Sequence, residues 1–368
     1  MVKKSITYAD VGDNYDTKDP IKVLAQNAAY KTSDNLLKHT YFEIADTRGE
    51  SAFVWQQGNI LMASVIEGLG TKNLIADEMR KITGKTYYDV IAHDTVATII
   101  NDLITVGAAP LVINAYWAIE DNSWLQDKKR MNDLINGWKD ACNISGVTWG
   151  GGETPTLKGI MKKNVIELGG SATGVITSKK SFITDKKLKN GDQILLLKSN
   201  GINANGVSLV RAIGKKLSQG YATKLQSGQL YGEAVLSKSN IYAKLIQELL
   251  DKNIALHYIA NITGHGLRKI MRARQNFTYI LEKIVDPQEL FIFMQKKIHL
   301  SDYEMYATFN MGMDFALFVP EKDRQRAQQI IKQNNFESIH AGYIENGKKQ
   351  VIIKPKNIVY KGETLKVR

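Results

Sequence analysis

Three short polar segments, each placed directly after an apolar stretch, constrain this sequence more than any other feature. Glycine at such a junction lets the backbone approach a ligand closely, and the acid, amide or hydroxyl beside it supplies a binding group. The pattern is typical of strands that end in ligand-binding loops, so it predicts an α/β protein of the α+β type. The segments are Glu67-Gly68-Leu69-Gly70-Thr71-Lys72, Gly150-Gly151-Gly152-Glu153-Thr154-Pro155 and Asn261-Ile262-Thr263-Gly264-His265-Gly266.

The first segment combines free backbone amides with a hydroxyl, an ammonium and a carboxylate. Gly68, Gly70, Thr71 and Lys72 are suited to hold phosphate where a helix begins, and Glu67 offers the oxygen ligand that Mg²⁺ prefers. The order Gly-Thr-Lys differs from that of a P-loop, and the second half of a Rossmann fingerprint is missing. On spacing alone, a hairpin exit followed by a helix cap is the simpler interpretation.

The second segment places three glycines and an acid after a predicted short strand at 147–149. So many glycines lose more chain entropy on folding than an ordinary turn requires, which favours close approach of Gly151 and Gly152 to a ligand beside Glu153. The alternative is a tight crossover with an exposed acid.

The third segment offers the Thr263 hydroxyl, the Gly264 amide and the His265 imidazole at a predicted helix start. His265 could bind phosphate or transfer a proton, because the ordinary pKa of histidine lies near neutrality, or it could cap the helix. A metal role is disfavoured, since no second histidine or cysteine stands at ligand spacing.

A long helix is predicted over 87–106, and four polar residues share one of its faces. They are Asp94, Thr98, Asn101 and Asp102, which cover an arc of roughly 100° at about 100° per residue. If this face borders a cleft, its two carboxylates can hold Mg²⁺; if it faces water, it is a solvated side. Periodicity leaves both interpretations open.

The length of 368 residues exceeds what one hydrophobic core usually serves, so two domains are predicted. The polar stretch 179–192 is the best junction and gives domains at 1–178 and 179–368. Apolar periodicity predicts further helices at 19–38, 129–145, 207–217, 240–250 and 323–333, and strands at 53–55, 60–66, 110–119, 165–176, 194–197, 258–261 and 315–319. The turn at 57–59 between the first two strands predicts a hairpin, and Ser301 with Glu304 has the spacing of a capping box at a helix start.

Composition excludes several classes of protein. No apolar run reaches the roughly 20 residues of a membrane helix and no secretory signal is recognisable, so a cytoplasmic protein is expected. Cys142 is the only cysteine, which excludes an intrachain disulfide. The net charge of +12 comes from scattered lysines without a basic block, so nucleic-acid binding is not expected.

These segments, taken in order, resemble aminoimidazole ribonucleotide synthetase, also called phosphoribosylformylglycinamidine cyclo-ligase. The resemblance covers most of the chain. The pieces that carry it are Tyr8 to Gly12, Gly68 to Lys72, Asn101 to Leu103, Gly107 to Pro110, Gly151 to Thr154, Asn205 to Arg211, Ile262 to Gly264 with Gly266, and Glu304 to Tyr306 with Thr308 to Gly312.

The resemblance implies a two-lobed PurM-like architecture, with an N-terminal mixed sheet that forms a barrel across a homodimer and a C-terminal α/β lobe. It also implies ATP and Mg²⁺ as cofactors and a phosphorylated ribonucleotide, formylglycinamidine ribonucleotide, as substrate. Metal would be held by Glu67, Asp94, Asp102 and Glu153, and Asp102, Asn203 and His265 would be catalytic. Nucleotide would contact Gly68, Gly70, Thr71, Lys72, Asp94, Asn101, Gly151, Gly152, Thr154, Asn205, Thr263 and Gly264.

Several positions depart from the family pattern. Glu67 replaces an aspartate, Asn203 stands where a histidine is characteristic, and His265 replaces a glycine. The glycine-rich stretch expected before the first hairpin is missing, because 41–53 contains only Gly49. These departures keep two alternatives open: another ATP-dependent kinase or synthase of the same superfamily, and a nucleotide-binding paralogue without catalysis.

Overall fold

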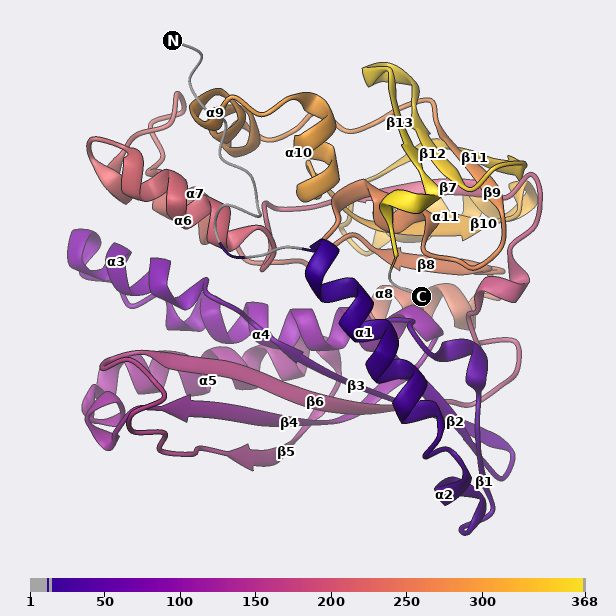
Figure 1. Ribbon diagram of the computed structural model, residues 1–368, viewed down its shortest axis with the longest axis horizontal. Coiled ribbons are helices and arrows are strands. Elements are labelled where there is room, and N and C mark those ends of the chain that lie inside the picture. Colours follow the sequence, from indigo (N-terminus) through magenta and orange to yellow (C-terminus); the bar gives the residue numbers. More distant parts are fainter. Residues whose placement is uncertain (1–11, 13–14, 367–368) are drawn as a thin grey trace.

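The computed structural model describes residues 12 and 15–366, and they form two lobes that each contain one sheet (Figure 1). The predicted mixed α/β fold is confirmed. The first sheet has six strands, in the spatial order β1 (Tyr41–Glu43), β2 (Phe53–Gln57), β3 (Ile60–Gly68), β6 (Ile166–Ile176), β4 (Ala109–Ile119) and β5 (Thr148–Glu153).

The first lobe is built around a hairpin and two long helices. β2 and β3 pair antiparallel from Phe53 opposite Ser64 to Gln57 opposite Ile60, which confirms the predicted hairpin. The helices α4 (Tyr88–Leu103) and α5 (Lys128–Ser145) pack on the sheet and on one another. The lobe is completed by α3 (Asn73–Thr83), which starts directly after the first glycine segment.

The second lobe holds seven strands, in the order β13 (Ile358–Lys361), β12 (Gln350–Ile353), β9 (Phe277–Leu281), β11 (Ser338–Asn346), β7 (Gln193–Lys198), β10 (Met313–Val319) and β8 (Tyr258–Asn261). All seven residues of β10 are buried, as expected for an interior strand that pairs with β7 and β8 and is covered on both faces. Its helices are α6 (Val207–Lys216), α7 (Tyr231–Val235), α8 (Ala243–Asp251), α9 (Glu289–Ile298), α10 (Asp302–Thr308) and α11 (Glu321–Gln333).

The long helix α4 lies between the two lobes, which is why almost every residue in it is buried. Its apolar side packs on β3 and β6, and its polar face meets the segment around Ser237 to Tyr242 of the second lobe. Both interpretations of the polar face therefore need refinement. Asp94 and Asn101 form the contact between the lobes, whereas Thr98 and Asp102 line a cleft.

Two predicted elements differ from the structure. The single helix expected over 19–38 is two helices in the structure, α1 (Tyr15–Tyr30) and the short α2 (Asp34–Leu37). The hydroxyls of Thr32 and Ser33 donate to the carbonyls of Ala29 and Tyr30, so the side chains compete with the helical pattern at the break. The second difference concerns residues 150–153, which continue strand β5 and do not form a loop.

The glycines of β5 are explained by how closely it lies against β4. A Cβ at Gly152 would stand 2.3 Å from the Ala115 carbonyl oxygen, and one at Gly150 would stand 2.7 Å from a methyl of Val112. The register of the two strands shifts between Ile113 and Asn114. Close strand packing at an irregular register thus requires this glycine run, whatever ligand the protein binds.

In the described part of the chain, no helix has both the length and the apolar character needed to cross a membrane.

Candidate functional site

A polar cleft of about 680 Å³ lies between the lobes, in the size range of small-molecule sites. The first lobe contributes the end of β3, the start of the following turn and the last part of α4. The second lobe contributes the loop after β8 and the start of α6. Helix α1, which lies across the junction of the lobes, adds Lys18, Lys22 and Gln26 (Figure 1).

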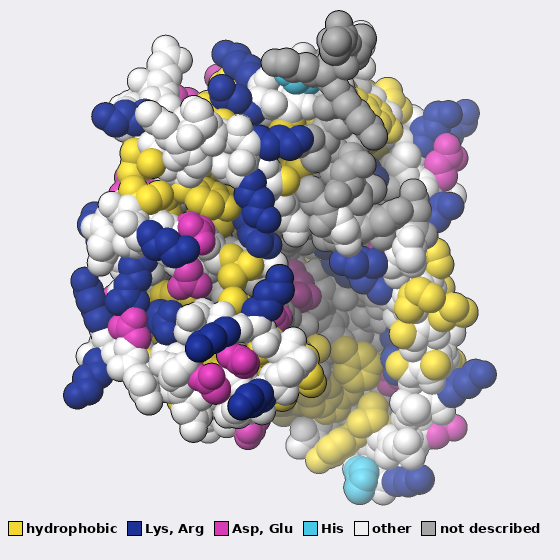
Figure 2. Space-filling model, turned by 60° about the vertical axis from the view of Figure 1, so that its left-hand side comes forward, with side chains coloured by type: hydrophobic (Ala, Val, Ile, Leu, Met, Phe, Trp, Pro, Cys, Tyr) yellow, Lys and Arg dark blue, Asp and Glu magenta, His cyan; other side chains and the backbone are white. Residues whose placement is uncertain are grey.

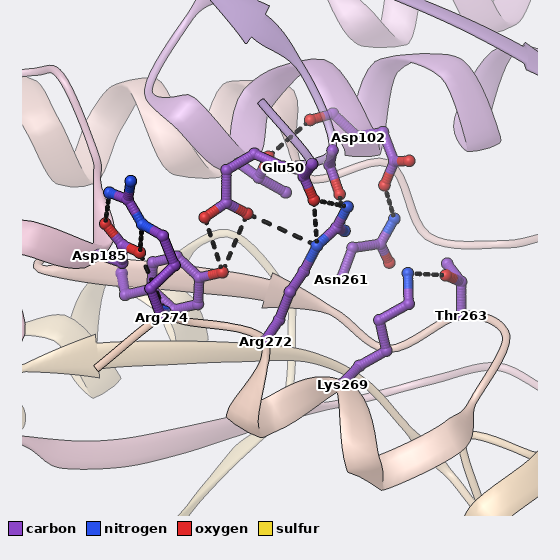
Figure 3. A network of polar contacts seen from close by, with 12 residues as sticks. Glu50, Asp102, Asp185, Asn261, Thr263, Lys269, Arg272 and Arg274 are labelled. Atoms are coloured by element: carbon purple, nitrogen blue, oxygen red, sulfur yellow. Dashed lines mark hydrogen bonds and ion pairs between the residues drawn. The ribbon is translucent and has the colours of Figure 1, made fainter. Parts of the chain in front are cut away.

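Two carboxyl groups meet inside this cleft. Glu67, at the end of β3, is in hydrogen-bonding contact with Asp102, near the end of α4. Burial and the negative charge of Asp102 raise the pKa of Glu67 to about 7. The Nδ2 of Asn261 donates to Oδ1 of Asp102 at 2.7 Å and fixes it from the second lobe (Figure 3). Glu67 can therefore carry a proton near neutrality, and once it is ionised the two side chains can bind a cation.

Basic side chains face the carboxyl pair from the opposite wall. Burial lowers the pKa of Lys269 to about 8, and the Arg272 charge acts in the same direction. The Lys269 ammonium donates to the Thr263 hydroxyl at 2.9 Å, as Figure 3 shows. Arg272 donates to the Gly49 carbonyl and, at 2.8 Å, to the Ser51 hydroxyl. A polyanion entering the cleft would meet these cations beside the carboxyl pair.

The predicted phosphate loop lies at the cleft only in part. Gly68, Gly70 and Thr71 line it, and Gly70 has a φ of +75°, which a residue with a side chain adopts at a cost. Across the cleft stand Thr263 and Gly264, where the Gly264 amide donates to Oδ1 of Asn205 at 3.1 Å. Parts of the first and third glycine segments therefore meet Asn205, which lies just before α6, at one place.

His265 also lines the cleft, with a left-handed φ of +72°. Its Nε2 lies 2.9 Å from Oδ2 of Asp19 on α1, and burial lowers its pKa to about 4 in spite of that carboxylate. The imidazole is thus neutral at physiological pH. It connects α1 to the loop after β8, which is a positioning role that the sequence did not suggest.

Two predicted ligands, Lys72 and Asp94, lie elsewhere. Both side chains are fully buried and form an ion pair with each other. The Lys72 ammonium also donates to the Ser237 carbonyl, and the Ser239 amide donates to Asp94. With their hydrogen bonds used between the lobes, neither faces the cleft. The prediction of a phosphate role for Lys72 and a metal role for Asp94 is corrected accordingly.

Two further predicted residues have structural contacts. Asn101 donates to the Asn240 carbonyl at 2.8 Å and accepts from the Tyr242 amide, so its side chain joins the lobes. The Asn203 side-chain amide donates to Oδ2 of Asp314 at 3.1 Å. Asp314 is buried, and its burial raises the pKa of its carboxyl group to about 7. Asn203 does not line the cleft, although the next two residues do.

The glycine segment of β5 also stays outside the cleft. Gly152 and Glu153 border a separate hollow of about 580 Å³ on the first sheet, and Glu67 borders it as well. Gly151 and Thr154 line neither space. The four predicted metal ligands are therefore not brought together, because only Glu67 and Asp102 share the cleft.

The acids of the cleft suit Mg²⁺ only together with a phosphate-bearing ligand. Among the described residues, no group of three or more His, Cys, Asp or Glu side chains is arranged to hold a metal ion. Mg²⁺ in nucleotide sites is commonly bound by one or two carboxylates together with phosphates and water. The Glu67 and Asp102 pair meets that requirement for a metal that arrives with a phosphate.

Sequence reasoning missed part of the cleft wall. The residues that it did not predict are the lysines of α1, the neighbouring residues Glu50 and Ser51, and the basic residues Lys269 and Arg272. Gly49 had stood out only as the remnant of a missing glycine-rich stretch, yet the residues from Gly49 to Ser51 do reach the cleft. A signal existed for Lys269 and Arg272, since they follow the third glycine segment within one or two helical turns.

A two-lobed α/β protein with this cleft is matched by two family models. The model described as AIR synthase related protein, N-terminal domain, matches residues 49–176, and that of the C-terminal domain matches 189–354. The chain belongs to the AIR synthase related family. Its relatives named phosphoribosylformylglycinamidine cyclo-ligase include one from Methanosarcina acetivorans, 31% identical over 90% of this chain and 93% of the relative. Another, from Methanococcus maripaludis, is 29% identical over 93% of each.

Solved structures share the fold at low identity. Thiamine-monophosphate kinase from Stenotrophomonas maltophilia matches with a TM-score of 0.57 and 14% identity, over 82% of this chain and 88% of that one. Hydrogenase maturation protein HypE in complex with ATP matches with a TM-score of 0.52 and 14% identity, over 71% and 75%. At these identities the likeness shows the fold alone.

Proposed function

We propose that this chain is an ATP-dependent cyclo-ligase that converts formylglycinamidine ribonucleotide to aminoimidazole ribonucleotide in purine biosynthesis. One observation carries the proposal: Glu67 and Asp102 meet in the cleft beside Gly68 to Thr71 and Thr263 to Gly264. The reaction is that of the relatives named phosphoribosylformylglycinamidine cyclo-ligase, which match nearly the whole chain.

In this reaction the γ-phosphoryl group of ATP is transferred to the formamide oxygen, with ADP leaving. The amidine nitrogen then attacks the formyl carbon, loses a proton and expels phosphate as the imidazole closes. Catalysis needs neutralised phosphate charge and a nitrogen held against the carbon with water excluded. The cleft supplies amides and the Thr71 hydroxyl for phosphates, and the Lys269 ammonium for negative charge that develops on them.

We assign Glu67 and Asp102 to Mg²⁺, which would neutralise charge on the ATP phosphates. We assign Gly68, Gly70, Thr71, Thr263 and Gly264 to nucleotide or substrate. Asp102 is the strongest catalytic candidate, because Asn261 holds its carboxyl in place inside the cleft.

We further propose a homodimer formed through the first sheet. The side chains on its open face include Ile66, 79% exposed, together with half-exposed Val112 and Tyr116. A second copy would cover this apolar face. The domain limits 1–178 and 179–368 also remain proposals; the first sheet ends at Ile176 and the second begins at Gln193. We place the enzyme in the cytoplasm, where purine synthesis would occur.

The test is to incubate the purified chain with MgATP and formylglycinamidine ribonucleotide. We expect phosphate release that depends on the ribonucleotide, and an aminoimidazole product detected by diazotisation. ATP binding without such turnover would favour the non-catalytic paralogue. Phosphate transfer to a different acceptor would favour another kinase or synthase of the superfamily.

A further inference from the structure

A second cleft, of about 1330 Å³, adjoins the first along the junction of the lobes. Its walls are α3, the start of α5 and the loop at 162–165 from the first lobe, and α6 with the following turn from the second. Ser208 of α6 lines the first cleft, whereas Arg211 and Lys215 line the second. Since a helix rises about 1.5 Å per residue, the two clefts are only about one turn apart.

The second cleft carries an excess of positive charge. Its acids are already paired: Asp127 with Arg80, Asp77 with Arg130 at 3.8 Å and Glu78 with Lys81 at 2.7 Å. Arg130 is held further by its stacking over Trp124 and by a hydrogen bond to the Trp124 carbonyl. Within the described residues, four lining cations form no ion pair: Lys162, Lys163, Arg211 and Lys215.

These four cations face the cleft from both lobes. Lys162 and Lys163 stand on the loop before β6, opposite Arg211 and Lys215 on α6. Arg211 is half-buried and lies beside the Tyr221 hydroxyl, and the Tyr221 ring stacks on Tyr231 at 6.2 Å. Figure 2 turns this side of the molecule forward and shows Lys and Arg side chains on both lobes, with Asp and Glu side chains among them. Seven cations and three acids line this cleft, so an anion bound among the cations that form no ion pair would offset the excess positive charge.

We propose that the second cleft binds the phosphate group of a small phosphorylated molecule between Arg211 and Lys215 of α6 and Lys162 and Lys163 of the facing loop. A guanidinium matches two phosphate oxygens in its plane, and the lysines add charge without fixed geometry. This site differs from the first cleft in one respect: each of its carboxylates is already paired with a cation, so it needs no metal to accept phosphate. The proposal does not depend on the cyclo-ligase reaction.

The test is calorimetric titration of the full chain with ribose 5-phosphate at low salt, in the presence of a saturating non-hydrolysable ATP analogue. We expect one equivalent to bind. Lys215→Gln and Arg211→Gln should each weaken binding by roughly tenfold, because each removes a charge-assisted contact. Lys216→Gln is the matched control, since the next residue of α6 lines neither cleft. Lys215 is exposed, so its variant tests the site without endangering the fold.

Two results would overturn the proposal: absence of stoichiometric binding, or binding that the α6 variants leave unchanged. Two other results would support it and identify the source of the phosphate. A higher KM for formylglycinamidine ribonucleotide in Lys215→Gln, at unchanged kcat, would show that the substrate's own phosphate lies there. Lost ribose 5-phosphate binding at unchanged KM would indicate a separate ligand. If the chain had no cyclo-ligase activity, the titration would still decide the question.

Discussion

The two halves of α4 carry the same kind of residue for different purposes. Near its middle, Asp94 is sealed between the lobes by Lys72 and the Ser239 amide. Two turns later, Asp102 meets Glu67 at the cleft and is held by Asn261. One carboxylate has a dedicated cation and the other does not. An acid whose charge is already neutralised inside the protein serves the fold, whereas one lacking that cation can serve a ligand.

The largest expected effect is on stability, at the sealed end of the helix. Asp94→Ala would leave the buried Lys72 ammonium without its partner, which costs about 3–5 kcal/mol in other proteins. We expect the free energy of unfolding, measured with urea, to fall by that order. A double variant, Lys72→Met with Asp94→Leu, should recover much of the loss. A loss below about 1 kcal/mol in the single variant would contradict a structural role.

At the open end, the expected effect is on turnover. Asp102→Asn keeps an oxygen that can accept from Asn261 but removes the charge. We expect kcat to fall by about 100-fold, the scale of losing one preorganised electrostatic contact, while stability changes by less than about 1 kcal/mol. Steady-state phosphate release and urea unfolding measure the two quantities. Equal losses in both would make Asp102 a structural residue and remove the contrast with Asp94.

The next prediction concerns pH. With a pKa of about 7, Glu67 loses its proton as pH rises through neutrality, so MgATP should bind roughly fivefold more tightly at pH 7 than at pH 6. The sign for stability is opposite to that of an ordinary acid. Between about 4.5 and 7 the folded chain keeps a proton that the unfolded chain has lost, so this group's contribution declines as pH rises. Titrations at several pH values would measure the binding, and Glu67→Gln should flatten the profile.

The smallest effect should come from Lys269, whose positive charge favours ionised Glu67. In Lys269→Met the pH at which MgATP binding reaches half its maximum should move upward, and affinity at neutral pH should fall a few-fold, consistent with one screened charge. Lys322→Met, which changes an exposed lysine of α11, is the control. An unchanged pH midpoint in Lys269→Met would show that the two cleft walls do not interact.

Much of the fold could be predicted from the chain alone. The turn between two apolar runs predicted the β2 and β3 hairpin, and the Ser301 to Glu304 spacing predicted a capping box that the structure contains. Such features depend on residues close in sequence. The helix predicted over 19–38 failed because hydroxyls at 32 and 33 bond to nearby carbonyls, a competition that apolar periodicity does not register.

The candidate site was predictable only in its ingredients. The sequence by itself determined that glycines stand beside acids and hydroxyls in three segments, and that Asp94 and Asp102 share a helix face. Tertiary structure decided which of them meet, because the second lobe covers Asp94 and leaves Asp102 at the cleft. The glycines of β5 are required by its close pairing with β4. Helical spacing fixes the direction of a side chain on its own helix. What stands opposite that side chain depends on packing between residues more than a hundred positions apart.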